Sequence, residues 1–300
     1  MIKYYGNFQN INDLYLRNCF YWASKSNNFD VKAYQIEAES RKLPKTNAKK
    51  YVLVITGNET HDCLDDYYEE DARIIAIVKN YPAMANVSNK PGIEYSYQMK
   101  TVGNVPRFVT KPEDPRTLNV PLGIANDFPT YWNTRPELKI GFIGQWTKIR
   151  EYYVNRITEY FKDNLEDIDK SQFLFYKGFG PFVQGAKDGS LTTEDYSANL
   201  ANYNFSLCIS GQSPETYRIF ESAASGCAIV STPLPDTWYY KHLPALYISP
   251  QMDFEGYLLK AINDTSLIQK HRDATQIWYH NYAAPKAVGK KIAEHLENFT

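Results

Sequence analysis

Long apolar runs are missing from this sequence, and with them the usual signals of membrane insertion. No hydrophobic stretch approaches the 18 residues that a membrane-spanning helix needs, and the N-terminus, Met1 to Gly6, has no apolar segment of the kind found in secretory signals. The four cysteines are scattered and include no Cys-x-x-Cys pair, which suits a reducing compartment. We therefore expect a cytoplasmic protein without an integral membrane segment.

The sequence also lacks an excess of charge of either sign. Its 33 lysines and arginines nearly balance its 34 acidic residues, so the formal net charge is -1. Proteins that bind duplexes usually carry a basic face. Here the densest basic patch, residues 41–50, is more typical of a solvated loop. The charge balance therefore speaks, weakly, against a nucleic-acid partner.

Two motifs that would indicate other chemistry are absent or misplaced. The full G-x-G-x-x-G fingerprint is missing, which lowers the expectation of an NAD-dependent enzyme. The run Asp167-Ile-Asp169 matches an Asp-x-Asp metal motif, but it lies in a charged turn and does not follow an apolar strand. We therefore expect no obligatory metal and no cofactor.

Aromatic residues, by contrast, are abundant. They make up 15% of the chain and include 25 tyrosines. Such side chains fill cores and also stack on ring-shaped ligands. The composition therefore fits binding of a sugar or a base without requiring it.

Alternating helical and strand-like patterns predict an α/β fold. A helix is expected over 11–25, and the apolar runs Tyr51–Ile55 and Ile74–Val78 indicate strands buried on both faces. After a polar, proline-bearing linker at 127–136 the alternation restarts. Further strands are expected at 139–144, 173–178, 205–210, 227–231 and 247–249, with helices at 149–165 and from Pro214. Two such series across a linker indicate two Rossmann-like halves, each with a parallel sheet.

The most informative segment runs from Ser210 to Val230. Ser213 is predicted to be a helix N-cap, Pro214 suits the first helical position and Gly226 suits the C′ position. This helix would begin at the carboxyl edge of the sheet, where open α/β folds bind ligands. Backbone N–H groups there attract anions, and the hydroxyls of Ser213 and Thr216 add donors.

Charged side chains follow on this helix at helical spacing. Arg218 lies about one turn in, where its planar guanidinium could hold a diphosphate. Glu221, three residues further, could accept two hydrogen bonds from a ribose diol. The alternative is that Glu215, Arg218 and Glu221 form an exposed ladder of ion pairs, each contributing about 0.2–0.5 kcal/mol. Spacing alone does not separate the two interpretations.

The run Tyr217-Arg-Ile-Phe-Glu-Ser-Ala-Ala-Ser-Gly-Cys-Ala-Ile-Val230 resembles the donor-site segment of exostosin-like glycosyltransferases. In that family an arginine precedes a glutamate by three residues, and a small-residue turn with Gly-Cys leads into an apolar strand. The resemblance implies diphosphate contact at Arg218 and ribose contact at Glu221.

Two further segments agree with the family in order and spacing, so that the resemblance covers about residues 119–235. Gly141-Phe-Ile-Gly144, followed by Arg150, is similar to the first strand and phosphate-facing loop of the family's C-terminal domain. Asn119-Val-Pro-Leu-Gly123 is similar to the segment that closes its N-terminal domain.

The sequence departs from the wider pattern of retaining GT-B enzymes at one position. That pattern places two glutamates eight residues apart and would need a glutamate at position 213, where Ser213 stands. Glu215 is out of register. A sugar-contacting role for Glu215 therefore does not follow from the resemblance.

The resemblance implies a GT-B fold, in which two Rossmann-like, doubly wound domains face a cleft. We place the acceptor-side domain at 1–133, the nucleotide-sugar-binding domain at 138–275, and a C-terminal helix at 276–300. This helix either returns to the first domain or packs on its own. The residues assigned to donor binding are Gly144, Gln145, Arg150, Gly178, Ser213, Pro214, Glu215, Thr216, Tyr217, Arg218 and Glu221.

A transferase that inverts its anomeric centre also needs a general base near the acceptor hydroxyl. The cluster Gly57-Asn-Glu-Thr-His-Asp62 follows a buried strand and contains three candidates, Glu59, His61 and Asp62. The alternative is a polar loop in which Asp62 caps a helix.

The sequence thus predicts a metal-independent glycosyltransferase, a hexosyl- or pentosyltransferase. It would move a sugar from a nucleotide-diphosphate sugar to an acceptor hydroxyl of a glycan or another molecule. Three alternatives stay open: a sugar-nucleotide epimerase or hydrolase, a catalytically silent nucleotide-sugar-binding protein, and a transferase acting on modified bases in DNA.

Overall fold

A computed structural model gives the fold of this 300-residue chain. It describes residues 2–6, 11–27, 29–86, 97–126, 128–130, 139–144, 147–164, 173–177, 192–211, 213–248, 256, 260 and 264–300. Among the helices of this described part, none is both long and apolar enough to cross a membrane.

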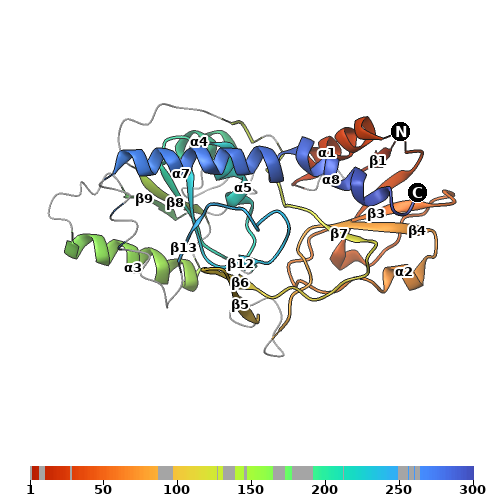
Figure 1. The fold of residues 1–300 in the computed structure, drawn as a ribbon, viewed down its shortest axis with the longest axis horizontal. Helices are drawn as coiled ribbons and strands as arrows, with labels where there is room; N and C mark the ends of the chain where they lie inside the picture. Colours follow the sequence, from red (N-terminus) through yellow and green to blue (C-terminus); the bar gives the residue numbers. More distant parts are fainter. Residues whose placement is uncertain are drawn as a thin grey trace. The chain divides into compact units, whose positions relative to one another are not determined.

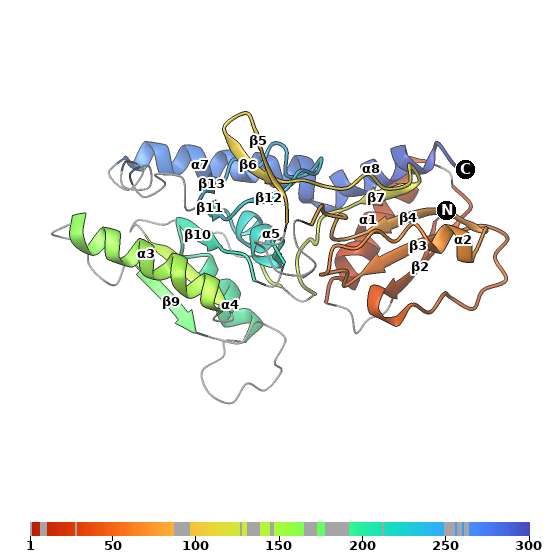
Figure 2. The same cartoon turned by 90° about the horizontal axis from the view of Figure 1, so that it is seen from below.

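The chain divides into two compact units, and Figures 1 and 2 label their helices and strands where there is room. Unit 1 comprises Met1–Asn126, Pro235–His242 and His280–Thr300, and unit 2 comprises Asp127–Leu234 and Leu243–Tyr279. The C-terminal segment thus belongs with the N-terminal unit. Residues Pro235–His242, which the predicted boundaries place in the second domain, also belong to unit 1.

Unit 1 contains a parallel sheet of five strands in the order β1-β2-β3-β4-β7. These strands are β1 (Lys3–Tyr5), β2 (Lys32–Glu37), β3 (Tyr51–Thr56), β4 (Ile74–Lys79) and β7 (Thr117–Asn119). Figure 2 shows β2, β3 and β4 side by side. Every residue of β3 is buried, as expected for a strand covered on both faces. The strands predicted at 51–55 and 74–78 are confirmed.

Two helices from opposite ends of the chain cover one face of this sheet. Figure 1 shows α1 (Asp13–Ser26) and α8 (Pro285–Leu296) side by side. Their apolar residues form one core with Val52 and Val54 of β3. Gly289 permits the close approach of the two helices, because a Cβ there would lie 2.4 Å from a carbonyl oxygen of α1. The helix predicted over 11–25 is confirmed as α1.

Shorter elements cover the second face of the unit 1 sheet. They are η1 (Ala38–Ser40) and α2 (Tyr67–Glu70), which pack with the side chains of Tyr51, Leu53 and Ile55. The stretch 81–117 contains a hairpin. Its strands are β5 (Met99–Val102) and β6 (Val105–Phe108), and β12 (Leu234–Pro235) pairs with β6. The sequence did not indicate β6, because this strand contains Pro106 and proline is uncommon inside a sheet.

Unit 2 contains a second parallel sheet, with strand order β13-β11-β10-β8-β9. Its strands are β8 (Ile140–Gly144), β9 (Phe173–Lys177), β10 (Phe205–Cys208), β11 (Ala228–Ser231) and β13 (Leu246–Tyr247). All five were predicted from their apolar runs. Every residue of β8, β10 and β11 is buried, and in β13 Tyr247 is buried and Leu246 half-buried.

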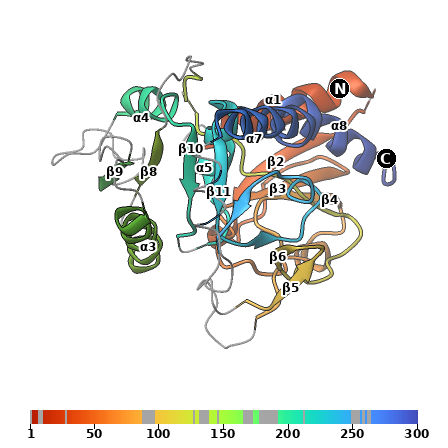
Figure 3. The ribbon, with the colours of Figure 1, turned by 60° about the vertical axis from the view of Figure 1, so that its left-hand side comes forward.

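Helices cover both faces of the unit 2 sheet. They are α3 (Lys148–Asn164), α4 (Thr193–Leu200), α5 (Tyr217–Ala224) and α7 (Thr265–Trp278). Figure 3 shows β8 and β9 between α3 and α4. A π-helical segment, η4 (Tyr279–Ala283), follows α7 where the chain passes from unit 2 to unit 1.

Candidate functional site

The strand order of unit 2 reverses at β8. From β8 the chain proceeds to β9 on one side and then crosses to β10 on the other side. The segments that follow β8 and β10 therefore leave the sheet in opposite directions. Open α/β sheets bind ligands at such a switch point, outside the carboxyl ends of the strands. The residues just beyond β8 and β10 are thus the first place to look for a site.

Arg150 connects these two strand ends. It lies in the first turn of α3, after β8, and its Nε donates to the carbonyl oxygens of Ile209 and Ser210, just after β10, at 3.2 Å each. The residue is only 7% exposed, and its guanidinium carbon lies 5.6 Å from the centre of the Phe142 ring. Gly211 leaves room for it, because a Cβ there would lie 2.8 Å from Nη2.

Arg218 brings a second guanidinium to the same aromatic ring. Its guanidinium carbon lies 4.5 Å from the centre of the Phe142 ring, and the residue is 9% exposed. Gly144 makes this position possible, since a Cβ there would lie 1.9 Å from Nη2 of Arg218. Within the described part of the chain, its Nε and Nη1 have no hydrogen-bond partner and no carboxylate forms an ion pair with it.

Two buried cations therefore share one aromatic ring. Burial and, after it, the positive charge of Arg218 lower the pKa of Arg150 to about 9. For Arg218, whose Nε and Nη1 have no hydrogen-bond partner among the described residues, burial of the charge is unfavourable. An anion bound beside both guanidinium groups would remove their repulsion and supply hydrogen-bond acceptors to Arg218. The arrangement is thus suited to a phosphate or diphosphate group.

Helix α5 begins later than its sequence pattern predicts. Its first residue is Tyr217, and Thr216, in an extended conformation, occupies the N-cap position. The predicted N-cap, Ser213, and the predicted first helical residue, Pro214, lie before the helix. The Ser213 hydroxyl instead accepts the backbone N–H two residues on, at 3.1 Å. Such local side-chain turns compete with helix formation.

The hydroxyl of Thr216 is a polar group at the start of α5. Its buried Oγ1 has no hydrogen-bond partner among the described residues, so it is placed to bind an anion beside the helix N-terminus. Tyr217 is partly buried at the first helical position. The predicted end of the helix is confirmed, since Gly226 follows the C-cap residue with φ of +73°.

The exposed ion-pair ladder is excluded by burial. Glu215, Arg218 and Glu221 are only 3%, 9% and 2% exposed, respectively. Oε2 of Glu221 accepts a hydrogen bond of 2.8 Å from the hydroxyl of Tyr196. Burial and the neighbouring charge of Glu221 raise the pKa of Tyr196, so that the phenol keeps its proton. Glu221 is therefore a buried carboxylate that lies one turn beyond Arg218 and is held by the hydrogen bond from Tyr196.

Four residues singled out in the sequence lie outside the described part of the structure. They are Gln145 and Gly178, both assigned to donor binding, and the pair Asp167 and Asp169.

Unit 1 contains a cavity of about 250 Å³ beyond the carboxyl ends of β2 and β3. Two of the three candidate bases, Glu59 and Asp62, line it, together with Glu39. Loss of hydration and then the negative charge of Glu39 raise the pKa of Glu59. Oδ2 of Asp62 accepts a hydrogen bond of 2.6 Å from the hydroxyl of Thr60. The affinity of Glu59 for a proton is thus raised by its place in this cavity.

His61 does not line this cavity, although its sequence neighbours do. It is 2% exposed, and its Nδ1 lies 2.8 Å from the carbonyl oxygen of Pro82. Burial lowers the pKa of His61 to about 3, so the imidazole is neutral at physiological pH. Its ring packs edge-on against Tyr81 and Tyr97. These contacts are those of a residue that holds the loop in place.

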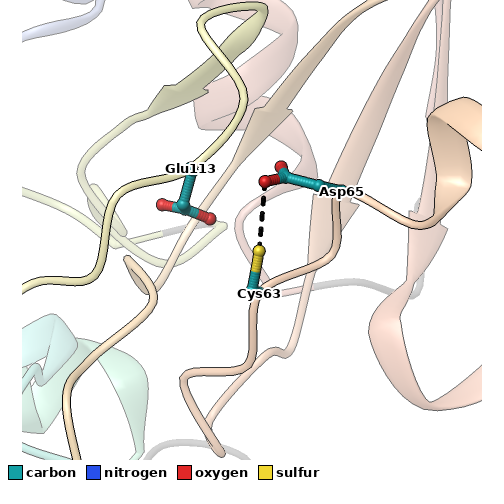
Figure 4. Close-up of side chains that lie close together, drawn as sticks. All are labelled: Cys63, Asp65 and Glu113. Atoms are coloured by element: carbon teal, nitrogen blue, oxygen red, sulfur yellow. Dashed lines mark hydrogen bonds between the residues drawn. The ribbon is translucent and has the colours of Figure 1, made fainter.

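A cluster that the sequence did not indicate lies elsewhere in unit 1. Figure 4 shows Cys63, Asp65 and Glu113, whose ligand atoms lie within 4.8 Å of one another. The thiol of Cys63 donates to Asp65 at 3.1 Å, and burial raises its pKa. The ammonium of Lys79 lies 2.5 Å from a carboxylate oxygen of Glu113. A metal ion here would have to compete with this cation and deprotonate the thiol, so the donor set fits an ion poorly.

Three residues of the unit 2 site were not found from the sequence. Phe142 is one apolar residue within a strand, and nothing local marks it as the ring that both guanidinium groups share. Tyr196 lies 25 positions from Glu221, so no spacing rule connects them. Gly211 follows an apolar strand directly, and a glycine there is a signal of close approach that could have been used.

Replacing Gly144 by alanine is expected to displace Arg218 and to weaken anion binding while the unit stays folded. The new Cβ would meet the end of a flexible side chain, so the guanidinium moves, and alanine also strains the backbone at the φ of +156° that Gly144 adopts. Because hydrogen bonds to charged groups contribute about 1.5–3 kcal/mol, we expect about tenfold or more weaker binding of inorganic pyrophosphate. Isothermal titration calorimetry measures the change.

Gly103→Ala is the control for this substitution. Gly103 also has a positive φ, but a Cβ there meets no atom within 4 Å. It should strain the backbone without changing pyrophosphate affinity. If Gly144→Ala binds pyrophosphate like the parent, Gly144 does not secure the arginine.

No protein-family model and no curated protein sequence matches this chain. Several solved structures do match it. The Anabaena protein HepE, crystallised in complex with UDP, is 10% identical, with 99% of both chains covered and a TM-score of 0.50. A mutant of S. aureus TarM in complex with fondaparinux, α-GlcNAc-glycerol and UDP is 11% identical, covering 92% of this chain and 58% of that chain at a TM-score of 0.50. A glycosyltransferase from Rickettsia africae is 15% identical, with 97% and 83% covered and a TM-score of 0.48.

These likenesses concern the fold. Together with the two parallel sheets they confirm the predicted α/β class, a GT-B fold with two Rossmann-like units. At such low identity they assign no chemistry to individual residues. The functional argument therefore depends on the arginines and the carboxylate of unit 2.

Proposed function

We propose that this protein is a glycosyltransferase that takes its sugar from a nucleotide-diphosphate sugar bound to unit 2. The observation that carries the proposal is the pair of buried guanidinium groups of Arg150 and Arg218, which share one ring at the switch point of the sheet. A diphosphate is the ligand whose charge and geometry match two planar cations. HepE and TarM, with the same fold, were each crystallised with UDP.

Each residue of the proposed donor site has a distinct role. Arg218 and Arg150 bind the diphosphate, and the N-terminus of α5 with the hydroxyl of Thr216 adds neutral donors. Glu221, one turn further along α5, accepts hydrogen bonds from the ribose. The roles of Arg218 and Glu221 are the ones implied by the resemblance to exostosin-like glycosyltransferases, which we retain as the family proposal.

The two arginines would also stabilise the leaving nucleotide diphosphate during transfer. Positive charge fixed where negative charge develops lowers the barrier without reorganisation of the protein. We therefore propose a reaction that needs no metal ion for this step and no cofactor. The transferred group would be a hexose or a pentose.

For the acceptor we propose the cavity of unit 1. Its volume of about 250 Å³ lies below the roughly 300–1,000 Å³ of pockets that hold drug-sized ligands, and so suits a single sugar ring. Glu59 is the proposed base, because it lines this cavity and its pKa is raised toward the working range of a base. His61 is not proposed, because it lies outside the cavity lining. No observation favours a base in DNA over a glycan hydroxyl.

The cellular location proposed is the cytoplasm. All four cysteines are free thiols, and Cys63 is exposed. Exposed free thiols persist in reducing compartments.

The proposed donor is tested by thermal denaturation with a panel of nucleotide-diphosphate sugars. A donor present at 100 times its dissociation constant should stabilise the protein by about 2.7 kcal/mol. The uridine, guanosine, adenosine and thymidine diphosphates should compete, and the corresponding monophosphates should bind more weakly. If no nucleotide diphosphate raises the midpoint of unfolding, the proposed function is wrong.

Product analysis with the bound donor separates the alternatives. A transferase consumes donor faster when an acceptor sugar is added and forms a new glycoside. An epimerase or hydrolase converts the donor without acceptor, and a silent binding protein leaves it unchanged.

A further inference from the structure

Tyr196 reaches from α4 to the carboxylate of α5. Its hydroxyl donates to Oε2 of Glu221 at 2.8 Å, and the two residues are 4% and 2% exposed. A hydrogen bond to an ionised acceptor in a buried place is stronger than one between neutral groups. This bond therefore determines where the carboxylate of Glu221 lies.

The position of the Tyr196 side chain is itself well defined. Its ring meets Phe128 edge-on, with ring centres 5.8 Å apart. The next residue, Ser197, donates its hydroxyl to the carbonyl oxygen of Pro129. The helix α4 is capped by Thr192, whose side chain accepts the backbone N–H of Asp195 at 3.0 Å. Packing and capping thus hold the phenol in the orientation that donates to Glu221.

The chemistry of a carboxylate explains why such a donor matters. An ionised carboxylate has two oxygens and about four acceptor positions, so it can accept from a phenol and from a ribose at the same time. Its rotation decides which positions face the ligand. A fixed donor on Oε2 selects one rotation before the ligand arrives, which reduces the ordering cost of binding.

We propose that Tyr196 is a positioning residue, which orients Glu221 toward the ribose hydroxyls and so sets the preference of the site for ribonucleotides over 2′-deoxyribonucleotides. This inference rests on the proposed function, because it takes a nucleotide diphosphate as the ligand. Tyr196 acts through Glu221 and has no contact of its own with the ligand. Its contribution is therefore specific to the sugar of the nucleotide.

The test compares UDP and GDP with their 2′-deoxy forms, bound to the full-length parent and to Tyr196→Phe. Phenylalanine keeps the ring against Phe128 and removes only the donor. Calorimetry should show ribonucleotide affinity falling about tenfold or more, as expected for one lost hydrogen bond to a charged group, with the 2′-deoxy affinity almost unchanged. The ribo-to-deoxy preference should therefore shrink by the same factor.

Tyr203→Phe is the matched control, since Tyr203 is a fully buried tyrosine of the same unit whose ring lies against Gly141. It should leave the ribo-to-deoxy preference as in the parent. In a Glu221→Gln background, Tyr196→Phe should have a much smaller effect, because the two residues act as one unit. This double-mutant cycle also distinguishes positioning from a general loss of stability.

The outcomes are distinct. If the parent binds UDP or GDP but Tyr196→Phe weakens the ribo and deoxy forms equally, or changes neither, the positioning role is wrong and the proposed donor site stands. If the parent binds none of the four nucleotides, the proposed function and this inference both fall.

Discussion

Replacing Arg218 by alanine is expected to abolish most donor binding without destabilising the protein. Removing one member of a buried pair of opposite charges costs about 2–5 kcal/mol, so we expect the dissociation constant of the nucleotide diphosphate to rise about 100-fold. In the ligand-free protein, by contrast, the substitution should not lower the free energy of unfolding. There, Arg218 faces the like charge of Arg150, and its Nε and Nη1 have no partner among the described residues.

The contrast between the two states is the diagnostic result. The free energy of unfolding of ligand-free Arg218→Ala should equal or exceed that of the parent, while the stabilisation by donor disappears. Thermal denaturation with and without nucleotide diphosphate measures both quantities. Lys270→Ala, at an exposed position of α7 in the same unit, should leave both unchanged. An Arg218→Ala protein that binds donor like the parent would contradict the assignment.

The second large effect concerns the stability of unit 1. Lys79 has a fully buried side chain, and its ammonium lies 2.5 Å from Glu113, whose side chain is 6% exposed. The same ammonium donates to the carbonyl oxygen of Asp62 at 3.0 Å. Glu113→Gln keeps the shape and removes the negative charge. We expect a loss of about 3–5 kcal/mol in the free energy of unfolding, because a buried cation is left without its anion.

A paired replacement separates the contribution of charge to the stability from that of packing. Lys79→Met combined with Glu113→Leu removes both charges, and it should recover most of the stability that the single change loses. Glu294→Gln is the surface control, since Glu294 is half-exposed and lies 3.5 Å or more from the nearest lysines. It should cost about 0–1 kcal/mol. Urea titration measures all three, and a small effect of Glu113→Gln would show that the pair is dispensable.

The sequence predicted the sheet strands that are continuous apolar runs and missed strands in which polar residues or proline interrupt the run. Strands β3 and β4 are continuous apolar runs, and burial on both faces makes such runs unambiguous. Strand β2 was missed because its lysine, glutamine and glutamate break the pattern. Strand β6 was missed because it contains Pro106. Local pattern thus identifies the interior strands and fails at the polar ones.

For the site, the sequence indicated the charged residues and not what holds them. Arg218 and Glu221 were identified by spacing and resemblance, whereas the ring of Phe142 and the hydroxyl of Tyr196 come from other elements. Such partners meet only through the tertiary fold. The start of α5 was placed too early because Ser213 and Pro214 are good first residues of a helix, and the side-chain turn at Ser213 prevailed.

The composition of unit 1 from three separate stretches has a consequence for its synthesis. Its sheet emerges from the ribosome before unit 2, yet one face of that sheet is covered by Val288, Ile292 and Leu296 of α8. These residues are made only after unit 2. The strands of this sheet must therefore wait, without the cover of α8, while all of unit 2 is translated. Shielding of that apolar surface is needed most during this interval, because unit 1 begins before unit 2 and is completed after it.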